Sequence, residues 1–337
     1  MNVMITGVAG GIGSTLAWQL KQKGYRVIGV DNFNNGYYEN LFEGGEHVCD
    51  EFYERDIRDD ISMKLIMDNE KIDIVIHLAA ITSLPSAETD PRETIDVNVA
   101  GTASILDSVR KSNVKRTIIA STSAIYENSI HPPFKETDYL YPRLFYPLSK
   151  KMVEDLVESY IVNYGMDIVT LRFFNVFGPR QDIHRETPPL LNYITRCVAE
   201  ESEATFYSNG NQQRDYVHVD DVAEIIMLSM RVPEAAGKTF NVCTGTLTSV
   251  REIVEYAEKA YGKFEHKFIP AEKYWGAYKH LHYGNYPLKP KIIAKEVNKL
   301  AVGSYQHAKE ILGWNPNTNI EKLMVKTFKE SLERLNR

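Results

Sequence analysis

A glycine-rich turn between an apolar strand and a helical pattern constrains the fold of this chain more than any other feature. The segment 6–13 is Thr-Gly-Val-Ala-Gly-Gly-Ile-Gly, and it follows the apolar run 2–6 directly. Glycines allow backbone N–H groups to approach a pyrophosphate closely, and the N-terminus of the next helix attracts the same anion. The turn therefore predicts a dinucleotide site, with contacts from Gly7, Gly10, Gly11, Ile12 and Gly13.

An acidic residue ends the second expected strand. This strand, 26–30, leads into Asp31, at the distance of about 20 residues that is typical of a carboxylate that binds the cofactor ribose. The same charge would repel a 2′-phosphate, so we expect NAD and not NADP. The competing interpretation is a structural turn in which Asp31 only caps a loop.

Strand and helix patterns alternate through the first half of the chain. Nearly continuous apolar runs predict strands at 2–6, 26–30, 72–78, 116–120 and 167–173, with a weaker strand at 52–55. This order is typical of an α/β fold with a Rossmann, doubly wound parallel sheet.

Prolines near 179–189 interrupt this pattern and mark the start of a second region. We expect an NAD-binding domain at 1–178 and a smaller C-terminal α/β substrate domain at 179–337. Residues 215–250 are expected to return to the first domain through a strand at 238–242, and C-terminal helices are predicted at 250–261 and 320–335.

Composition excludes several classes of protein. The formal net charge is −6 without a block of basic residues, which argues against a nucleic-acid surface. No apolar run approaches the roughly 20 residues of a membrane span, and no export signal precedes the first strand. The three cysteines are far apart, which fits a reducing compartment. We expect a cytoplasmic protein with no membrane or nucleic-acid partner.

Tyr146 and Lys150 share one face of a predicted helix because they are four residues apart. A phenol has an ordinary pKa of about 10, and a nearby ammonium together with an oxidised nicotinamide favours the phenolate. Tyr146 is therefore a candidate general base for the oxidation of a sugar hydroxyl, and Lys150 a candidate partner of the nicotinamide ribose. The spacing by itself is common in a chain with 20 tyrosines, so its position after the glycine turn carries the hypothesis.

Three further strand ends offer candidate contacts. Asp56 and Ile57 follow the weak strand, where an acid can receive the adenine amino group or simply belong to a loop. Leu78, Ala79 and Ala80 end another strand with small residues that allow close approach of a cofactor, although packing explains them equally well. The hydroxyl-rich exit 120–126 lies at the edge where doubly wound sheets bind ligands, and the alternative is that its hydroxyls end the strand through local hydrogen bonds.

These motifs together resemble the extended short-chain dehydrogenase/reductase family, in its nucleotide-sugar epimerase and dehydratase branch of the UDP-galactose 4-epimerase type. The resemblance covers nearly the whole chain. It is carried by segments 6–13, 31–32, 56–57, 77–80, 98–102, 121–126, 146–150, 172–180 and 214–221.

The resemblance implies a role for each matched position. Thr122 is the expected catalytic hydroxyl, Tyr146 the base and Lys150 its activator. The remaining implied cofactor contacts are Asn32, Asn98, Ala120, Ser121, Phe174 and Val176. A nucleotide-diphosphate sugar is expected to contact Thr82, Thr122, Tyr146, Asn175, Leu190, Tyr207 and Arg214, with Arg214 gripping the diphosphate.

Within this branch the residues after Thr122 separate the reactions. Dehydratases and some decarboxylases carry a carboxylate there, whereas this chain has Ser123 and Ala124. A 4-epimerase is therefore expected, with reversible oxidation of one sugar carbon. A 4,6-dehydratase, a net oxidoreductase and a non-catalytic dinucleotide sensor stay open as alternatives.

The chain departs from the family pattern at two places. Ala301 to Ser304 stand where the family has Arg-x-Gly-Asp, so a second diphosphate arginine is missing unless Lys299 or another residue replaces it. Glu127 follows Tyr126 in place of a frequent glycine. Both departures are expected near the sugar-nucleotide site.

Three smaller expectations complete the sequence-based picture. The resemblance implies a homodimer formed through helices near 102–112 and 147–164. His280 and His282 have no third ligand at convincing spacing, so no metal is expected. The aromatic segment 274–286 is either a lid or sugar wall, or an irregular loop packed on the C-terminal region.

Overall fold

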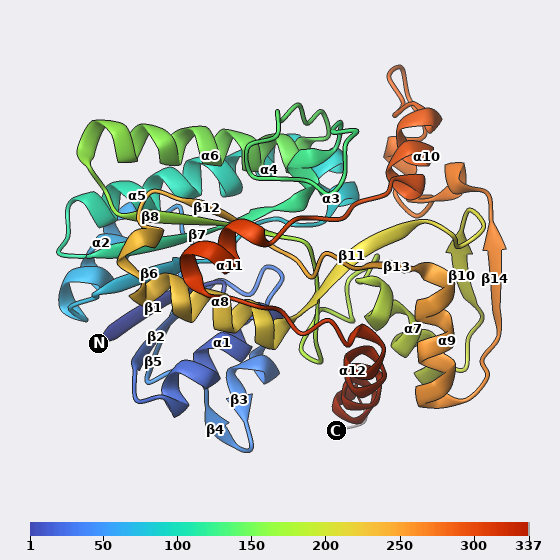
Figure 1. Ribbon diagram of the computed structural model, residues 1–337, viewed down its shortest axis with the longest axis horizontal. Helices are drawn as coiled ribbons and strands as arrows, with labels where there is room; N and C mark the ends of the chain where they lie inside the picture. The colour runs from blue at the N-terminus through green and yellow to red at the C-terminus, as the bar shows by residue number, and fades with distance from the viewer. Residues whose placement is uncertain (336–337) are drawn as a thin grey trace.

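A seven-stranded parallel sheet forms the centre of the computed structural model, which describes residues 1–335 (Figure 1). The strand order is β12-β8-β7-β6-β1-β2-β5, so the chain runs outward from β1 in one direction and then from β6 in the other. This reversal lies between β1 and β6, the point where doubly wound sheets bind ligands. The strands are β1 (Asn2–Thr6), β2 (Arg26–Asp31), β5 (Glu51–Glu54), β6 (Ile74–His77), β7 (Arg116–Thr122), β8 (Ile168–Phe173) and β12 (Thr239–Val242).

Helices cover both faces of this sheet. Figure 1 shows α2 (Asp60–Asn69), α5 (Gly101–Arg110) and α6 (Phe145–Tyr164) on one face, and α1 (Gly11–Gln22) and α8 (Val219–Arg231) on the other. Alternate residues of β1 serve the two layers: Val3 and Ile5 belong to the core under α1 and α8, and Met4 to the core under α2 and α5. This double coverage explains why the strands lack polar alternation.

The Rossmann prediction is confirmed, and the expected strands differ from the observed ones only at their ends. The weak strand at 52–55 is β5, and the run expected at 238–242 is β12, which pairs in parallel with β8. The strand expected at 116–120 continues to Thr122, because its hydroxyl-rich end still pairs with β8.

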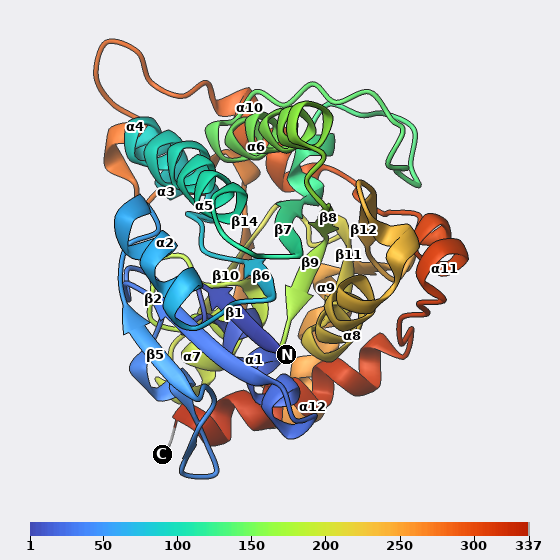
Figure 2. The same cartoon turned by 90° about the vertical axis from the view of Figure 1, so that its left-hand side faces the viewer.

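A smaller α/β region lies beside the carboxyl edge of the sheet (Figures 1 and 2). In it, β9 (Asn175–Phe177), β11 (Gln213–His218) and β13 (Leu247–Ser249) form one sheet, and β10 (Ala204–Tyr207) pairs with β14 (His266–Ile269). The helices α7 (Leu190–Ala199), α9 (Val250–Tyr261) and α12 (Ile320–Leu335) enclose a second core around Phe206, Ile253 and Phe328.

The remaining elements are short. They are η1 (Tyr38–Leu41), the β3–β4 hairpin (Phe42–Glu43 and Glu46–His47), α3 (Leu84–Thr89), α4 (Pro91–Ile95), the π-helical turn η2 (Asp96–Ala100), η3 (Ser123–Tyr126), η4 (Pro233–Ala235), η5 (Ala271–Lys273), η6 (Lys279–Leu281), α10 (Pro290–Asn298) and α11 (Gln306–Leu312). Among residues 1–335, no helix has the length and apolar character needed to cross a membrane. All three cysteines are free and buried.

The glycine turn is packed too closely for side chains. Gly7 has a φ of +73°, and a Cβ atom there would lie 2.8 Å from the backbone nitrogen of Ala79 in the loop after β6. At Gly13 a Cβ atom would lie 2.3 Å from the carbonyl oxygen of Gly7. Because backbone atoms form both contacts, neither can be relieved by rotation of a side chain. Glycine at these positions lets α1 begin directly against the ends of β1 and β6.

We expect Gly13→Ala to lower the free energy of unfolding by about 1–3 kcal/mol, since the added methyl group forces the turn apart. Chemical denaturation measures this change. Gly44→Asn is the matched control, because Gly44 has a φ of +58° with nothing within 4 Å of its Cβ position, and asparagine tolerates that conformation. Equal unfolding free energies for Gly13→Ala and the wild-type chain would contradict the packing described above.

Candidate active site

A single cavity of about 790 Å³ lies at the carboxyl edge of the central sheet and extends into the smaller region. Its wall contains the ends of β1, β2, β6, β7 and β8, as expected for a doubly wound sheet. It contains every residue predicted to bind a cofactor or a nucleotide sugar except Asn98. The predicted residues that line it are Gly7, Gly10, Gly11, Ile12, Gly13, Asp31, Asn32, Asp56, Ile57, Leu78, Ala79, Ala80, Thr82, Ala120, Ser121, Thr122, Tyr146, Lys150, Phe174, Asn175, Val176, Leu190, Tyr207 and Arg214.

One end of the cavity has the chemistry of a dinucleotide site. Helix α1 begins at Gly11 without a side-chain cap and without an acidic residue in its first turn, so the positive end of its dipole is not neutralised by its own side chains and suits an anion. Asp31 is held by the N–H groups of Ala9 and Phe33, at 2.9 and 2.8 Å. Burial raises the pKa of this carboxyl, and these backbone hydrogen bonds oppose the rise. The glycine cradle and the fixed carboxylate fit a pyrophosphate and a ribose.

A buried chain of hydrogen bonds fixes the position of the loop after β6. The Thr102 hydroxyl donates to the Asn98 carbonyl oxygen (2.6 Å), so it accepts from His77 Nε2 (3.0 Å). The other ring nitrogen, Nδ1, therefore accepts from the Thr6 hydroxyl (2.7 Å), whose oxygen also receives the N–H of Ala79 (3.3 Å). Complete burial lowers the pKa of His77 to about 3, and the charge of Lys150 adds to this effect. The neutral His77 ring therefore joins the end of β6, where it lies, to the end of β1 at Thr6.

Asn98 lies behind the cavity wall, not in it. Its side chain accepts the N–H of Ile81 (2.8 Å) and donates to the Ile81 carbonyl oxygen (3.0 Å) and the Ser149 hydroxyl (3.0 Å). The cofactor contact predicted for Asn98 stays a prediction, and in the structure its side chain is used within the protein. Asn98 holds the cavity-lining loop of Ile81 against α6, beside Lys150.

Thr122, Tyr146 and Lys150 all line the cavity. Lys150 Nζ donates to the Ala120 carbonyl oxygen (2.9 Å), and burial lowers the pKa of its amine to about 8. Burial raises the pKa of the Tyr146 phenol, and a hydrogen bond with Thr122 opposes the rise. Helix α6 carries the tyrosine and the lysine, and the end of β7 carries the threonine. The arrangement brings a phenol, a hydroxyl and an amine to one wall.

Behind Lys150, a buried ion pair supports the end of β7. Glu154 receives two hydrogen bonds from Arg172, at 3.0 and 2.7 Å, and one from the Ser121 hydroxyl at 2.5 Å. Its negative charge raises the pKa of Lys150 against the effect of burial. Glu154 lies one helical turn beyond Lys150, so the same helix carries both the amine and the charge that favours its protonation.

Arg185 is a cavity residue that sequence reasoning missed. It lies within the proline-interrupted stretch after β9, its Nε donates to the Thr187 carbonyl oxygen (2.8 Å), and its charge lowers the pKa of Tyr146. The cation that lowers the pKa of this phenol is thus Arg185, whereas the effect expected of Lys150 stays a prediction. The only sequence feature that marks this segment is the proline-rich interruption of the strand–helix pattern.

The end of the cavity predicted to bind a nucleotide sugar contains hydrogen bonds that the sequence did not predict. Arg214 lines the cavity, but its guanidinium donates to the carbonyl oxygens of Glu296 (2.6 Å), Val297 (3.2 Å) and Lys299 at the end of α10. Asn175 donates to the Asp215 carbonyl oxygen (2.9 Å). The Asp215 carboxylate in turn accepts the N–H groups of Thr244 (2.8 Å), Gly245 (2.8 Å) and Gly303 (3.3 Å).

The two departures from the family pattern have different structural settings. Ala301 lines the cavity, and its main chain pairs with β11. Lys299 lines it as well and forms an ion pair with Glu296 (2.6 Å). Glu127 is not among the lining residues: its carboxylate accepts the N–H groups of Arg143 (2.7 Å) and Leu144 (3.0 Å) just before α6. Only the change at Ala301 therefore alters the cavity.

Only the first part of the aromatic segment 274–286 borders the cavity. Tyr274 and Trp275 line it, whereas Tyr283 and Tyr286 are exposed. The rings of Tyr207 and Tyr274 lie 4.8 Å apart at this end. His280 and His282 are outside the lining, and His218 is buried at the N-cap of α8, where it accepts the N–H of Asp220 (3.2 Å).

Comparisons with known proteins agree with this geometry. Residues 4–327 match the family model described as GDP-mannose 4,6 dehydratase. A UDP-glucuronate 4-epimerase from Thermodesulfobacterium geofontis is 29% identical, over 98% of this chain and 96% of that protein.

Solved structures are similar over their full length. A UDP-glucose 4-epimerase from Thermotoga maritima, crystallised with UDP-glucose, is 30% identical with a TM-score of 0.85 and covers 100% of both chains. A UDP-glucose 4-epimerase from Thermus thermophilus, in complex with NAD, is 27% identical with a TM-score of 0.82, over 98% of this chain and 99% of that one.

The low pKa of His77 predicts a pH-dependent stability. Between about pH 6.5 and pH 3 the unfolded chain binds a proton at His77 that the native protein does not bind. The free energy of unfolding should therefore decrease as pH falls through this window, by up to about 1.4 kcal/mol per pH unit from this group. Denaturation curves at pH 7, 6 and 5 measure the slope.

His77→Gln removes this titration, so its unfolding free energy should depend less on pH than that of the wild-type chain. His131→Gln, at an exposed position, is the matched control and should follow the wild-type slope. Parallel pH dependences for wild type and His77→Gln would show that the buried ring is not neutral in the native protein.

Proposed function

The chain belongs to the nucleotide-sugar epimerase and dehydratase branch of the extended short-chain dehydrogenases/reductases, and we propose on that premise that it is an NAD-dependent nucleotide-sugar 4-epimerase. One observation carries the proposal. Thr122, Tyr146 and Lys150 line the same cavity of about 790 Å³ as the glycine turn, so a cofactor bound at the turn and these three side chains share one space.

The cofactor is proposed to lie between the glycine turn and Lys150. The α1 N-terminus would hold the pyrophosphate, Asp31 the adenine ribose, and Lys150 the nicotinamide ribose. Bound NAD supplies the oxidation of the sugar carbon and, on return, its reduction. Asp31 also supports NAD over NADP, because the cavity wall there carries a negative charge.

We assign to Tyr146 the role of the base that takes the proton of the sugar hydroxyl. Its phenol oxygen receives a hydrogen bond from Thr122 that favours the ionised form, and the charge of Arg185 acts in the same direction. Lys150 adds an ammonium on the same helix face. Tyr146 would take the proton from the sugar O4 as the transient 4-keto sugar forms, and would return it to O4 once C4 is reduced from its opposite face.

The residues after Thr122 support epimerisation over dehydration. Ser123 and Ala124 line the cavity and bring no carboxylate to the position next to the catalytic hydroxyl. Elimination of water needs an additional acid and base, whereas epimerisation needs only one group that takes and returns a proton. A cytoplasmic homodimer remains part of the proposal, and the exposed Met152, Val162 and Tyr164 of α6 are available for its interface.

We expect the purified chain to invert C4 of a nucleotide sugar without added NAD. The panel contains UDP-, GDP-, CDP- and dTDP-sugars, including UDP-glucuronate because a relative is named for that substrate. Mass spectrometry should show a product of unchanged mass, and proton NMR the opposite configuration at C4. Tyr146→Phe should lower kcat by about 10²–10⁴-fold, the usual contribution of a general base.

Tyr160→Phe, on the same helix but outside the cavity lining, is the matched control and should keep wild-type turnover. A product lighter by one water would identify a dehydratase. Keto product formed together with an equal amount of NADH would identify a net oxidoreductase. If no member of the panel binds or reacts, the dinucleotide-sensor alternative replaces the proposed enzyme.

A second prediction concerns the alkaline limb of the pH profile. The Lys150 pKa of about 8 means that the ammonium is lost as pH rises through this value, so kcat should fall there. Glu154 raises this pKa, and Glu154→Gln should therefore move the limb to lower pH. Glu158→Gln, at an exposed position one turn further along α6, is the control. If kcat of folded Glu154→Gln falls at the same alkaline pH as that of the wild-type chain, the ionisation of Lys150 does not set this pH dependence.

A further inference from the structure

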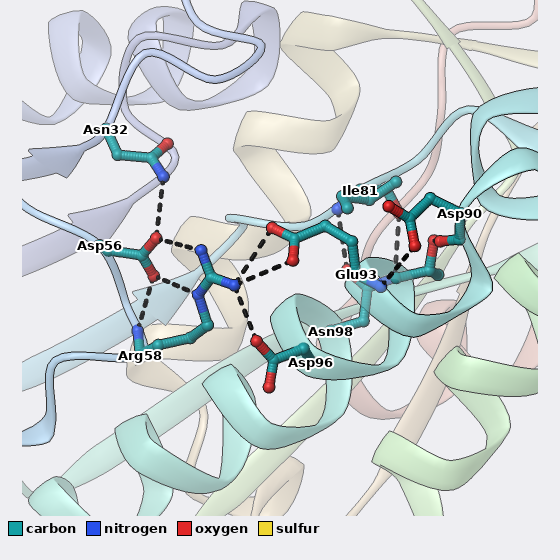
Figure 3. Close-up of polar contacts among 9 residues, drawn as sticks. Asn32, Asp56, Arg58, Ile81, Asp90, Glu93, Asp96 and Asn98 are labelled. Atoms are coloured by element: carbon teal, nitrogen blue, oxygen red, sulfur yellow. Dashed lines mark hydrogen bonds and ion pairs between the residues drawn. The ribbon is translucent and has the colours of Figure 1, made fainter.

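Arg58 bridges three carboxylates at the adenine end of the cavity (Figure 3). On one side its Nε and Nη2 donate to the two oxygens of Asp56, at 3.0 and 2.8 Å. On the other side its Nη1 donates to Glu93 (3.1 Å) and to Asp96 (2.8 Å). A planar guanidinium suits such a bridge because its donors have a fixed geometry.

The bridge fixes the orientation of the Asp56 carboxylate. Oδ1 receives the backbone N–H of Arg58 (2.9 Å) as well as its Nε, and Oδ2 receives Asn32 Nδ2 (3.2 Å) as well as Nη2. These contacts, with the Arg58 side chain first among them, lower the pKa of Asp56. Asp56 is therefore held as an ionised group, which can only accept hydrogen bonds.

The bridge also connects two loops of the cavity wall. Asp56 follows β5, whereas Glu93 and Asp96 belong to α4 and the π-helical turn η2. The same turn carries Asn98, which holds the loop of Ile81 after β6 (Figure 3). Without the guanidinium, three carboxylates would face one another and repel. Arg58 thus keeps the two loops at a fixed separation.

We propose that Arg58 is a positioning residue that makes this end of the cavity selective for a purine with an exocyclic amino group. The inference rests on the proposed function, since the purine is the adenine of the dinucleotide. An amino group can donate to Oδ2 of the fixed carboxylate in place of Asn32, whose hydrogen bond is the longest of the four at 3.2 Å. A purine with an oxo group at the same carbon presents an acceptor to this oxygen, so two acceptors face each other without a proton between them.

The test compares NAD with nicotinamide hypoxanthine dinucleotide, in which an oxo group replaces the adenine amino group. Isothermal titration calorimetry on the full chain, after removal of any co-purified nucleotide, gives both dissociation constants. We expect the wild-type chain to prefer NAD by about tenfold or more, as the loss of a hydrogen bond to a charged group implies. In Arg58→Met this preference should fall towards one, mainly through weaker binding of NAD.

Two further variants separate positioning from other roles. Glu93→Gln combined with Asp96→Asn leaves Arg58 and Asp56 in place but weakens the anchor, so it should also reduce the preference. Arg92→Met removes an exposed guanidinium from α4, the helix that carries Glu93. Arg92 lies outside the cavity lining, so this variant should keep the wild-type ratio of the two dissociation constants. If Arg58→Met does not fold, as judged by thermal unfolding, Arg58→Lys serves in its place, because an ammonium cannot make the two-sided bridge.

The proposal is overturned if folded Arg58→Met or Arg58→Lys keeps the wild-type ratio of the two dissociation constants. This includes the case in which both dinucleotides bind more weakly by the same factor, because Arg58 would then contact the base directly. A wild-type ratio of one also overturns it. If neither dinucleotide binds the wild-type chain, the NAD-dependent function itself fails, and the role of Arg58 fails with it.

Discussion

The close approach of the loops after β1 and β6 is the constraint on which the rest of the site depends. Gly7 lies so near Ala79 that no side chain fits between them, and Thr6 and His77 join the same two strand ends by a buried hydrogen bond. His77 continues this contact to Thr102 and so to the helices that cover the sheet. The glycine turn, the wall opposite it and the start of α5 are therefore placed as one unit.

A few hydrogen-bonding groups connect this unit to helix α6. Asn98 reaches both the loop after β6 and Ser149, the residue before Lys150. Lys150 and Glu154 then hold the end of β7, the first through Ala120 and the second through Ser121. These contacts are buried or partly buried, and a buried hydrogen bond left without its partner costs about 1–3 kcal/mol. The positions of Thr122 and Tyr146 follow from this accumulated rigidity.

The sequence was sufficient for the features that depend on local pattern. Strand runs, the glycine turn, Asp31 and the tyrosine–lysine spacing predicted the Rossmann sheet and the part of the cavity wall that these features form. It was insufficient where a role depends on a partner from a distant segment. Asn98 faces Ile81 instead of the cavity, Arg214 is taken up by carbonyl oxygens some 80 residues away, and Arg185 reaches the surroundings of Tyr146 from an irregular loop. No periodicity in the chain encodes such pairings.

The main-chain pairing of Ala301 has a consequence for divergence. Its N–H and carbonyl oxygen are used by Gln213 and Asp215 of β11, and the residue is buried at the cavity wall in a small apolar cluster with Phe134 and Phe174. The main-chain pairing does not depend on which side chain stands there, whereas the cluster suits a small apolar one. Related chains can therefore differ at this position and keep the pairing with β11, within the space that the cluster leaves.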